Sequence, residues 1–403
     1  MADSVETGFL SVGQAAARTI VRRAAERGRL QRTLLIHGAP GSGADRFVDD
    51  LLALLFCERV DAAARPCNAC AGCRGARSRS HPDLVIGSPD RWRELKGSGE
   101  SVVAAARRWL AESAGAPVVA ERRILLVERV DRAGDQIQNA LLKALEEPGP
   151  RQMFILVADD LSAVLPTIRS RCQPLRLGPV PRDELSAWLV DHEHLPADQA
   201  DLLARLASGR SGTAVAMARD PDLIAWRRRA QLQLLGLLDG GVADRFGALK
   251  DLLEDATRRA GAVAGSGIDV SPADGATRPE GAGEADEPVR TPASQQRAGS
   301  MLLVDAWGEL ARDLLVIAGD RPELAAAAEV LQGAPAAARR VGQRSLAVFL
   351  RRLERVREGL EANAAPRLAM EVAMLAWPRA QAPAAPAGAG TATTGHASTS
   401  GVR

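Results

Sequence analysis

The segment His37-Gly-Ala-Pro-Gly-Ser-Gly-Ala-Asp45 lies between two apolar stretches of the chain. It follows Leu34-Leu-Ile36 and precedes Phe47-Val-Asp49. This order predicts a buried strand, a glycine-rich loop and a helix. Gly38 and Gly43 keep the spacing of the phosphate-binding pattern G-x-x-x-x-G-K-[ST], in which backbone N–H groups surround a phosphate at a helix N-terminus.

The same segment lacks the two side chains that carry the chemistry of this pattern. A lysine neutralises the β- and γ-phosphates, and a serine or threonine hydroxyl binds Mg²⁺. Here those positions hold Ala44 and Asp45, and no lysine precedes Lys96. In a partly dry site, the electrostatic repulsion between a carboxylate at residue 45 and a triphosphate would cost on the order of several kcal/mol. We therefore expect a degenerate loop that neither binds nor hydrolyses ATP; the alternative is a glycine-rich turn with no relation to phosphate binding.

The composition is that of an ordinary globular chain, long enough for two or three domains. Of 403 residues, 46% are hydrophobic and 25% are charged, and 52 basic residues nearly balance 50 acidic ones. The net charge of +2 gives no overall attraction to nucleic acid, which leaves only local patches. The sequence shows no uninterrupted apolar segment of membrane-spanning length (about 18 residues) and no secretory leader, so we expect a cytoplasmic protein without a membrane segment.

Four of the five cysteines lie close together in the sequence: Cys57, Cys67, Cys70 and Cys73. Four thiolates are the number that a closed tetrahedral zinc site requires, and the two-residue gaps let consecutive cysteines face one ion. In a reducing compartment such a cluster favours a metal over disulfides. We expect a structural zinc ion, because four protein ligands leave no position for a reacting water. The alternative, four unligated thiols on a polar excursion, would leave that segment with no core to order it.

Apolar runs alternate with helical patterns through the first half of the chain. Beyond the strand before the glycine loop, strands are predicted at 84–86, 123–127 and 153–157, and helices at 101–113 and 136–147. The alternation predicts an α/β domain, a parallel sheet with helices on both faces. Phosphate-loop ATPases place paired acids after the strand at this point of the chain, one to hold Mg²⁺ and one to activate water. Here Glu128 is followed by Arg129, so we expect Glu128 and Asp131 to make surface contacts or to cap the next helix.

From Pro179 onward the pattern is helical. Apolar stripes predict helices within 182–219, 221–257, 303–317, 346–360 and 366–377. Residues 259–299 are rich in Gly, Ala, Pro and acidic residues with few bulky apolar ones, which predicts a disordered insertion. Residues 380–403 have the composition of a disordered tail.

Together these features resemble the delta-prime subunits of bacterial DNA polymerase III clamp loaders, in the AAA+ fold group. The resemblance rests on the glycine loop, on the four cysteines after the first helix of the domain, and on three further segments: Asn139-Ala-Leu-Leu-Lys-Ala-Leu-Glu-Glu-Pro148, Leu165-Pro-Thr-Ile-Arg-Ser-Arg-Cys-Gln173 and Asn363-Ala-Ala-Pro-Arg-Leu-Ala-Met-Glu371. The ATP-hydrolysing gamma and tau subunits share these motifs but keep the lysine and threonine of the loop. Ala44, Asp45 and Arg129 depart from that pattern and favour the delta-prime type.

The resemblance implies three parts: an AAA+-type domain at 1–178 with the zinc module at 57–73, a helical lid at 179–240, and a helical collar at 241–379. It further implies a five-membered ring with gamma/tau ATPase subunits and a delta subunit, which loads a sliding clamp onto primed DNA. In such rings the arginine of Ser-Arg-Cys, here Arg171, reaches the ATP site of the neighbouring subunit. A guanidinium supplied in this way stabilises charge on the transferring phosphoryl group. Arg169 is the weaker candidate.

Neighbouring residues of these motifs receive no chemical role. Cys172 is expected to be a small buried packing residue, and Lys143, Glu146 and Glu147 are expected to serve the helix and its subunit contacts. Two other functions stay open from the residues alone. The first is a catalytically active ATPase of the gamma/tau type. The second is a zinc-dependent nucleic-acid module, which would need a basic, aromatic-rich surface beside the cysteines.

Overall fold

The computed structural model describes residues 8–265, 292–325, 333–361 and 364–380. A five-stranded parallel sheet forms the centre of the first half, in the order β2-β3-β4-β1-β5. The strands are β1 (Thr33–His37), β2 (Leu84–Gly87), β3 (Arg123–Val127), β4 (Gln152–Ala158) and β5 (Gln173–Arg176). The helices of this half are α1 (Ala15–Glu26), α2 (Ala44–Phe56), α3 (Ala71–Arg77), α4 (Pro89–Leu95), α5 (Val102–Glu112), α6 (Asp135–Glu146) and α7 (Pro166–Arg169).

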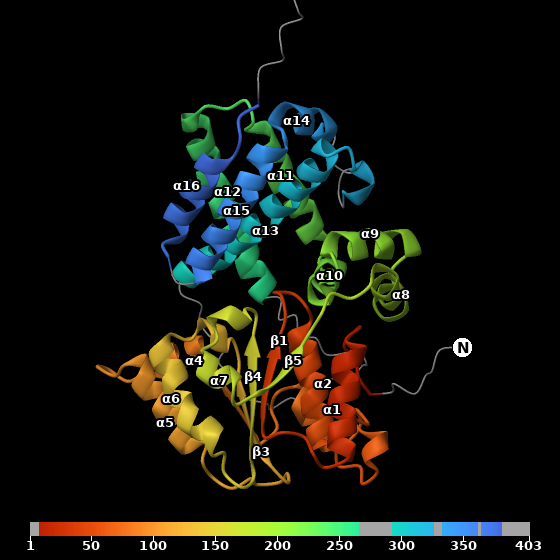
Figure 1. Cartoon of the computed structure of the whole chain (residues 1–403), viewed down its shortest axis with the longest axis vertical. Helices are drawn as coiled ribbons and strands as arrows, with labels where there is room; N and C mark the ends of the chain where they lie inside the picture. The colour runs from red at the N-terminus through yellow and green to blue at the C-terminus, as the bar shows by residue number, and fades with distance from the viewer. Residues whose placement is uncertain (1–7, 266–291, 326–332, 362–363, 381–403) are drawn as a thin grey trace, which may run out of the picture.

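Helices cover both faces of this sheet (Figure 1). Alternate residues of one strand point to opposite faces. On β1, Leu34 and Ile36 join a buried cluster with α1 and α2, whereas Leu35 joins a second cluster with α4, α5 and α6. Burial on both sides explains why β1, β3 and β4 are uninterrupted apolar runs. The predicted α/β class is therefore confirmed.

The second half of the described chain is helical. Three helices follow the sheet: α8 (Arg182–Glu193), α9 (Ala197–Ala207) and α10 (Ser211–Arg219). The remaining helices are α11 (Pro221–Gly236), α12 (Val242–Gly265), α13 (Pro292–Ala318), α14 (Ala334–Val341), α15 (Gln343–Glu361) and α16 (Pro366–Ala376), and they pack as a bundle (Figure 1). The long helix α13 lies against α12 and α15, and its Trp307 is fully buried. Among the described residues, no helix combines the length and apolarity that crossing a membrane requires.

The predicted insertion at 259–299 is wrong at both ends. Helix α12 continues to Gly265 and α13 begins at Pro292, so only 266–291 lies outside the described residues, as does 381–403 of the predicted tail. The reason is that small residues at the contact let α12 and α13 pack closely, so these segments are helical although they have few bulky side chains. A Cβ on Gly299 would lie 2.6 Å from the backbone nitrogen of Thr257, and Ala256 and Ser300 are fully buried. A composition of small residues predicts disorder, whereas here it permits close packing of α12 against α13.

Candidate functional site

The glycine loop connects β1 to α2 in left-handed conformations that glycine adopts readily. Gly41 has a φ of 78° and Gly43 a φ of 87°, and α2 begins at Ala44. The carboxylate of Asp45 points outward, with 87% of its side chain exposed. The loop therefore has the strand-loop-helix geometry expected from the sequence, with no lysine and no hydroxyl at its helix end.

The N-terminus of α10 sits directly on this loop. Ser211 Oγ donates a hydrogen bond to the carbonyl oxygen of Ser42 at 2.9 Å, and Gly212 N–H donates to the carbonyl oxygen of Gly41, also at 2.9 Å. A Cβ on Gly43 would lie 2.4 Å from Ser211 Oγ. These bonds use N–H groups and carbonyls that a helix end and a loop otherwise leave to solvent. Helix α10 and the loop thus form one packed unit.

A second connection links the same corner to the C-terminal helices. Arg210, just before α10, lies 3.1 Å from Glu309 of α13, measured from Nη2 to Oε1, and the same oxygen pairs with Arg227 of α11. Arg227 and Glu309 are about nine-tenths buried. Buried pairs of this kind strongly resist separation of their partners, because removing one leaves a charge without compensation. The loop, α10 and α13 are therefore joined by a continuous set of polar contacts.

The acids after β3 do not form a catalytic pair. Glu128 forms an ion pair with Arg79, and Asp131 Oδ2 accepts hydrogen bonds from the backbone N–H groups of Asp159 and Asp160. Neither caps α6, whose N-cap residue is Gly134, so that part of the prediction is wrong. The reason is that both carboxylates find partners on other segments at the same edge of the sheet.

The four cysteines come together as predicted. Their Sγ atoms all lie within 4.8 Å of one another, with Cys57 at the end of α2 and Cys70 as the N-cap of α3. Backbone N–H groups point at the sulfurs: Cys67 N–H lies 3.4 Å from the Sγ of Cys57, and Cys73 N–H lies 3.3 Å from that of Cys70. Such N–H groups favour thiolates, and chiefly the N–H of Ala69 lowers the pKa of Cys67 to about 6. The set could bind a metal ion.

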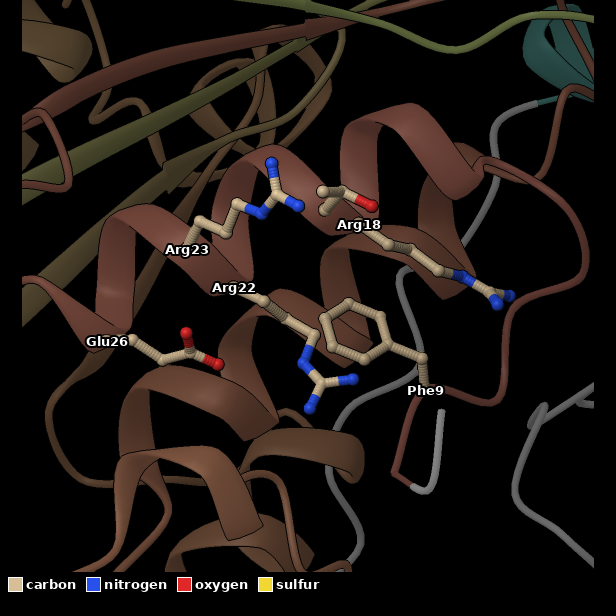
Figure 2. Close-up of a pocket in the computed structure, with 6 residues that line it drawn as sticks. Phe9, Arg18, Arg22, Arg23 and Glu26 are labelled. Atoms are coloured by element: carbon tan, nitrogen blue, oxygen red, sulfur yellow. The ribbon is translucent and has the colours of Figure 1, made fainter. Parts of the chain in front are cut away.

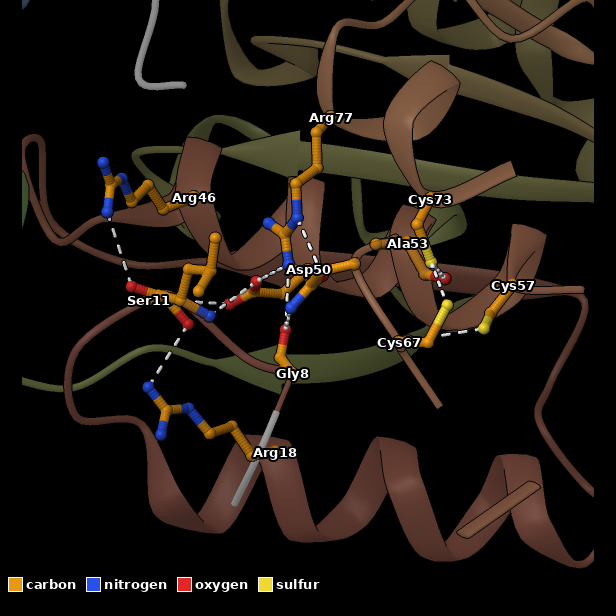
Figure 3. A network of polar contacts seen from close by, with 12 residues as sticks. Gly8, Ser11, Arg18, Arg46, Asp50, Ala53, Cys57, Cys67, Cys73 and Arg77 are labelled. Carbon is orange, nitrogen blue, oxygen red and sulfur yellow. Dashed lines mark hydrogen bonds and ion pairs between the residues drawn. The ribbon is translucent and has the colours of Figure 1, made fainter. Parts of the chain in front are cut away.

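Charged side chains attach this cysteine module, residues 57–73, to the sheet domain (Figure 3). Arg77 Nη2 lies 2.9 Å from Oδ1 of the fully buried Asp50 on α2 and also donates to the carbonyl oxygen of Gly8. Asp50 in turn accepts hydrogen bonds from the backbone N–H groups of Leu10 and Ser11. His81 is not in the sulfur cluster, because its ring stacks on Phe56. The module therefore helps to hold α2 and the N-terminal segment in place.

Arg171 lies just beyond α7 and is exposed on the surface of the sheet domain. Its Nη1 donates to the carbonyl oxygen of Thr167 at 2.9 Å, and its Nη2 pairs with Glu146 of α6. Arg169 is exposed on the same turn. Cys172 is buried, as predicted, and burial raises the pKa of its thiol to about 11. Arg171 is distant in sequence from the glycine loop and forms none of its contacts with that loop.

Two features were not predicted. Arg79 joins Asp49 and Glu128 beside the loop helix, and no sequence motif marks it. A cavity of about 210 Å³ also opens beside α1 (Figure 2). It is lined by Phe9, Arg18, Thr19, Arg22, Arg23 and Glu26, and the Arg18 guanidinium lies over the Phe9 ring. No residue of the glycine loop lines this cavity.

A parallel sheet with a glycine loop after β1, helices on both faces and helical parts behind it defines an AAA+-type fold. Residues 13–181 match the family model described as "DNA polymerase III, delta subunit". The chain is 29% identical to the delta-prime subunit of Escherichia coli K12 DNA polymerase III over 205 residues, 51% of this chain and 59% of that protein. It is 30% identical to the delta-prime subunit of Pseudomonas aeruginosa over 208 residues, 49% of this chain and 58% of that protein.

Other similarities are more distant. The tau subunit of E. coli is 28% identical over 49% of this chain and 30% of that protein. Among solved structures, a gamma subunit-related protein of Thermotoga maritima DNA polymerase III aligns over 91% of this chain and 99% of its own with 17% identity and a TM-score of 0.35. Over its first half the chain matches the DNA polymerase III delta-prime family. It spans about three-fifths of the length of the curated delta-prime relatives it matches first.

Proposed function

We propose that this chain is the non-hydrolysing subunit of a clamp loader, a stator that helps to load a sliding clamp onto primed DNA. The observation that carries the proposal is the glycine loop. Ala44 and Asp45 replace the lysine and hydroxyl, and α10 is bonded to the carbonyl oxygens of Gly41 and Ser42. In a hydrolysing subunit the lid must move with the nucleotide state. Here α10 is hydrogen-bonded to the glycine loop without a nucleotide.

The proposed partners follow from the family. The chain would sit in a five-membered ring with gamma/tau ATPase subunits and a delta subunit. Helices α8–α11 would form the lid at 179–240, and helices α12–α16 would form the collar at 241–379 that joins the ring. The Arg210–Glu309–Arg227 cluster supports a fixed angle between these parts.

Arg171 is proposed as the arginine finger for the neighbouring ATP site. Its exposure on the domain surface and its hydrogen bond to the carbonyl oxygen of Thr167 support this role. A guanidinium presents five donors in a planar fork and stays charged at all relevant pH values, which suits a phosphoryl group that gains charge in the transition state. Arginine fingers supplied in trans accelerate hydrolysis by roughly 10³–10⁵ in systems where they have been measured.

The cysteine module is proposed to hold a zinc ion as a purely structural element. Four thiolates satisfy tetrahedral Zn²⁺ completely, so the ion would supply folding energy to the module and no reacting water. The residues that would hold it are Cys57, Cys67, Cys70 and Cys73.

The experiment that tests this function is reconstitution of the loader with the full-length chain. We expect the chain to co-purify with the gamma/tau and delta subunits, and Arg171→Ala to lower the DNA- and clamp-stimulated ATPase while assembly stays intact. Arg169→Ala, on the same exposed turn, is the matched control and should retain turnover. Unchanged turnover in Arg171→Ala would remove the arginine-finger role, and failure to enter any complex would remove the loader role.

A catalytically active gamma/tau-type ATPase is the competing proposal. It would require a cation on the loop and an acidic pair after β3. The chain offers Ala44 and Asp45 on the loop and Arg129 after Glu128. The zinc-dependent nucleic-acid module has less support still, because the ring stack beside the cysteine module, His81 on Phe56, is buried and offers no surface on which a base could stack.

A further inference from the structure

Arg79 lies where the cysteine module, the loop helix α2 and the end of β3 meet. Its Nε is 2.9 Å from Oδ1 of Asp49, its Nη1 pairs with Oε1 of Glu128, and its Nη2 is 4.0 Å from Oδ1 of Asp45. The side chain is 28% exposed, and Asp49 is 16% exposed. One guanidinium thus faces three carboxylates that come from two different elements.

The backbone at Arg79 ends α3 in a Schellman motif, in which the N–H of Arg79 donates to the carbonyl oxygen of Ala76 and the N–H of Ser80 to that of Gly75. The φ of Arg79, 54°, lies in the left-handed region, which is unfavourable for a side chain as large as arginine. Here the side chain is held at three points, and a glycine would adopt the same backbone without strain but would leave the carboxylates uncompensated.

The two outer carboxylates occupy informative positions. Residue 45 is the position at which the phosphate-loop pattern places its Mg²⁺-binding hydroxyl. Glu128 directly follows β3, the strand after which ATPases place their Mg²⁺-binding acid. In those enzymes the metal ion lies between these two positions. In this chain the guanidinium of Arg79 lies between Asp45 and Glu128.

We propose that Arg79 is a built-in cation that fills the metal-ion position of the degenerate nucleotide site and keeps divalent cations out of it. The proposal rests on the proposed non-hydrolysing function and adds a cause for it. A covalently attached cation cannot exchange, so a positive charge stays beside Asp45, Asp49 and Glu128 in every state of the ring.

The segment that carries Arg79 also ties this site to the cysteine module. Arg79 follows α3, which contains Cys73, by two residues, and Arg77 of the same helix pairs with the buried Asp50 on α2. Arg77 at the end of α3 and Arg79 just after it therefore pair with two consecutive acids of α2, Asp50 and Asp49. The cysteines thus fix the strand end, the loop helix and the internal cation in one arrangement.

The test is divalent-cation binding by the full-length, zinc-loaded chain in the absence of nucleotide. Mn²⁺ is titrated and its free fraction is followed by electron paramagnetic resonance. We expect no Mn²⁺ site in the wild type, a site in Arg79→Gln, and loss of that site in the double variant Arg79→Gln with Glu128→Gln. Arg74→Gln is the matched control, because Arg74 lies on α3 and donates to the carbonyl oxygen of Ala69 outside the cluster.

Arg79→Gly is a second variant that removes the guanidinium and relieves the left-handed backbone, so it tests the same claim without a risk of strain. If both Arg79 variants retain zinc and helical content but bind no more Mn²⁺ than the wild type, the proposal is overturned. Mn²⁺ binding by the wild type that Glu128→Gln abolishes would overturn it as well. Failure of the proposed function would show differently, as ATP binding by the wild-type chain.

Discussion

The guanidinium of Arg171 lies 2.5 Å from the carboxylate of Glu146, measured from Nη2 to Oε1. The Arg171 side chain is 35% exposed and that of Glu146 46% exposed, so the pair is open to solvent. Exposed pairs contribute only about 0–1 kcal/mol. Glu146 is therefore a weak partner, which the proposed arginine-finger role would require a phosphate to displace, and Arg171 also donates to the carbonyl oxygen of Thr167.

Glu146→Gln tests this relationship. We expect the free energy of unfolding to change by less than about 1 kcal/mol, because the ion pair is solvent-exposed. In a reconstituted loader the stimulated ATPase should stay at the wild-type level, in contrast to Arg171→Ala. The measurements are urea unfolding of the isolated chain and steady-state turnover of the complex. Equal loss of turnover in Glu146→Gln and Arg171→Ala would contradict a displaceable partner.

Metal content tests the cysteine module. Purified protein should contain a single zinc ion per chain by elemental analysis, and Cys67→Ser should abolish it and lower the thermal midpoint, because four thiolates are needed to close the site. Cys172→Ser is the matched control, since Cys172 is buried in another part of the sheet domain. Equal zinc content in Cys67→Ser and Cys172→Ser would refute the assignment of the ligands.

Asp83 provides a test by pH. This fully buried carboxylate accepts hydrogen bonds from the backbone N–H groups of Val118, Val119 and Ala120, at 2.5–2.8 Å. Burial alone would raise its pKa, but these N–H groups outweigh burial, and the pKa lies below its ordinary value of 3.8. A lowered folded-state pKa means that the ionised form stabilises the fold above the unfolded-state pKa. That stability is lost as the pH falls through the folded-state pKa.

We therefore expect Asp83→Asn to cost about 1–3 kcal/mol at pH 7, because an amide offers one acceptor to three donors. The difference from the wild type should shrink when unfolding is measured at a pH below the folded-state pKa. Urea denaturation of both proteins, from pH 7 to below the folded-state pKa, measures this difference in the free energy of unfolding. A difference that does not depend on pH would show that the charge of Asp83 has no part in holding the backbone of residues 118–120.

The contact between the glycine loop and α10 is tested with two glycines. Gly43→Ala combines a positive φ with a Cβ placed 2.4 Å from Ser211 Oγ, whereas Gly28→Ala has a positive φ of 63° and no atom within 4 Å. Gly28→Ala is the control: it measures only the cost of the left-handed backbone, about 1 kcal/mol of unfolding free energy. We expect Gly43→Ala to cost clearly more and to increase hydrogen exchange at the start of α10. Equal losses of unfolding free energy in the two variants would mean that α10 does not pack tightly against the loop at Gly43.

The sequence predicted those elements whose signal is local. The strand before the glycine loop, the runs at 123–127 and 153–157 and the cysteine spacing each carry their own pattern, and the structure has them. Strand β5 was missed because it is short, contains Pro174 and buries only Leu175. Helix α3 was missed because the cysteine spacing was interpreted only as a ligand pattern.

The remainder of the site depends on contacts between distant segments. Nothing near Arg79 in the sequence shows that it meets Asp49 and Glu128, and nothing near Ser211 shows that it reaches the carbonyl oxygen of Ser42. Glu128 was expected to serve a surface contact or a cap for the same reason. Ion pairs between separate elements are set by the packing of the sheet and helices, which periodicity does not encode.

The chain is expected to have a nucleotide-binding fold that does not bind ATP. The most direct test is calorimetric titration of the isolated full-length chain with Mg·ATP. Three features predict no detectable binding: Ala44 and Asp45 on the loop, α10 bonded to the loop carbonyls, and Arg79 between Asp45 and Glu128. Binding in the micromolar range, with Mg·ATP seated over Ala44 and Asp45, would contradict the account.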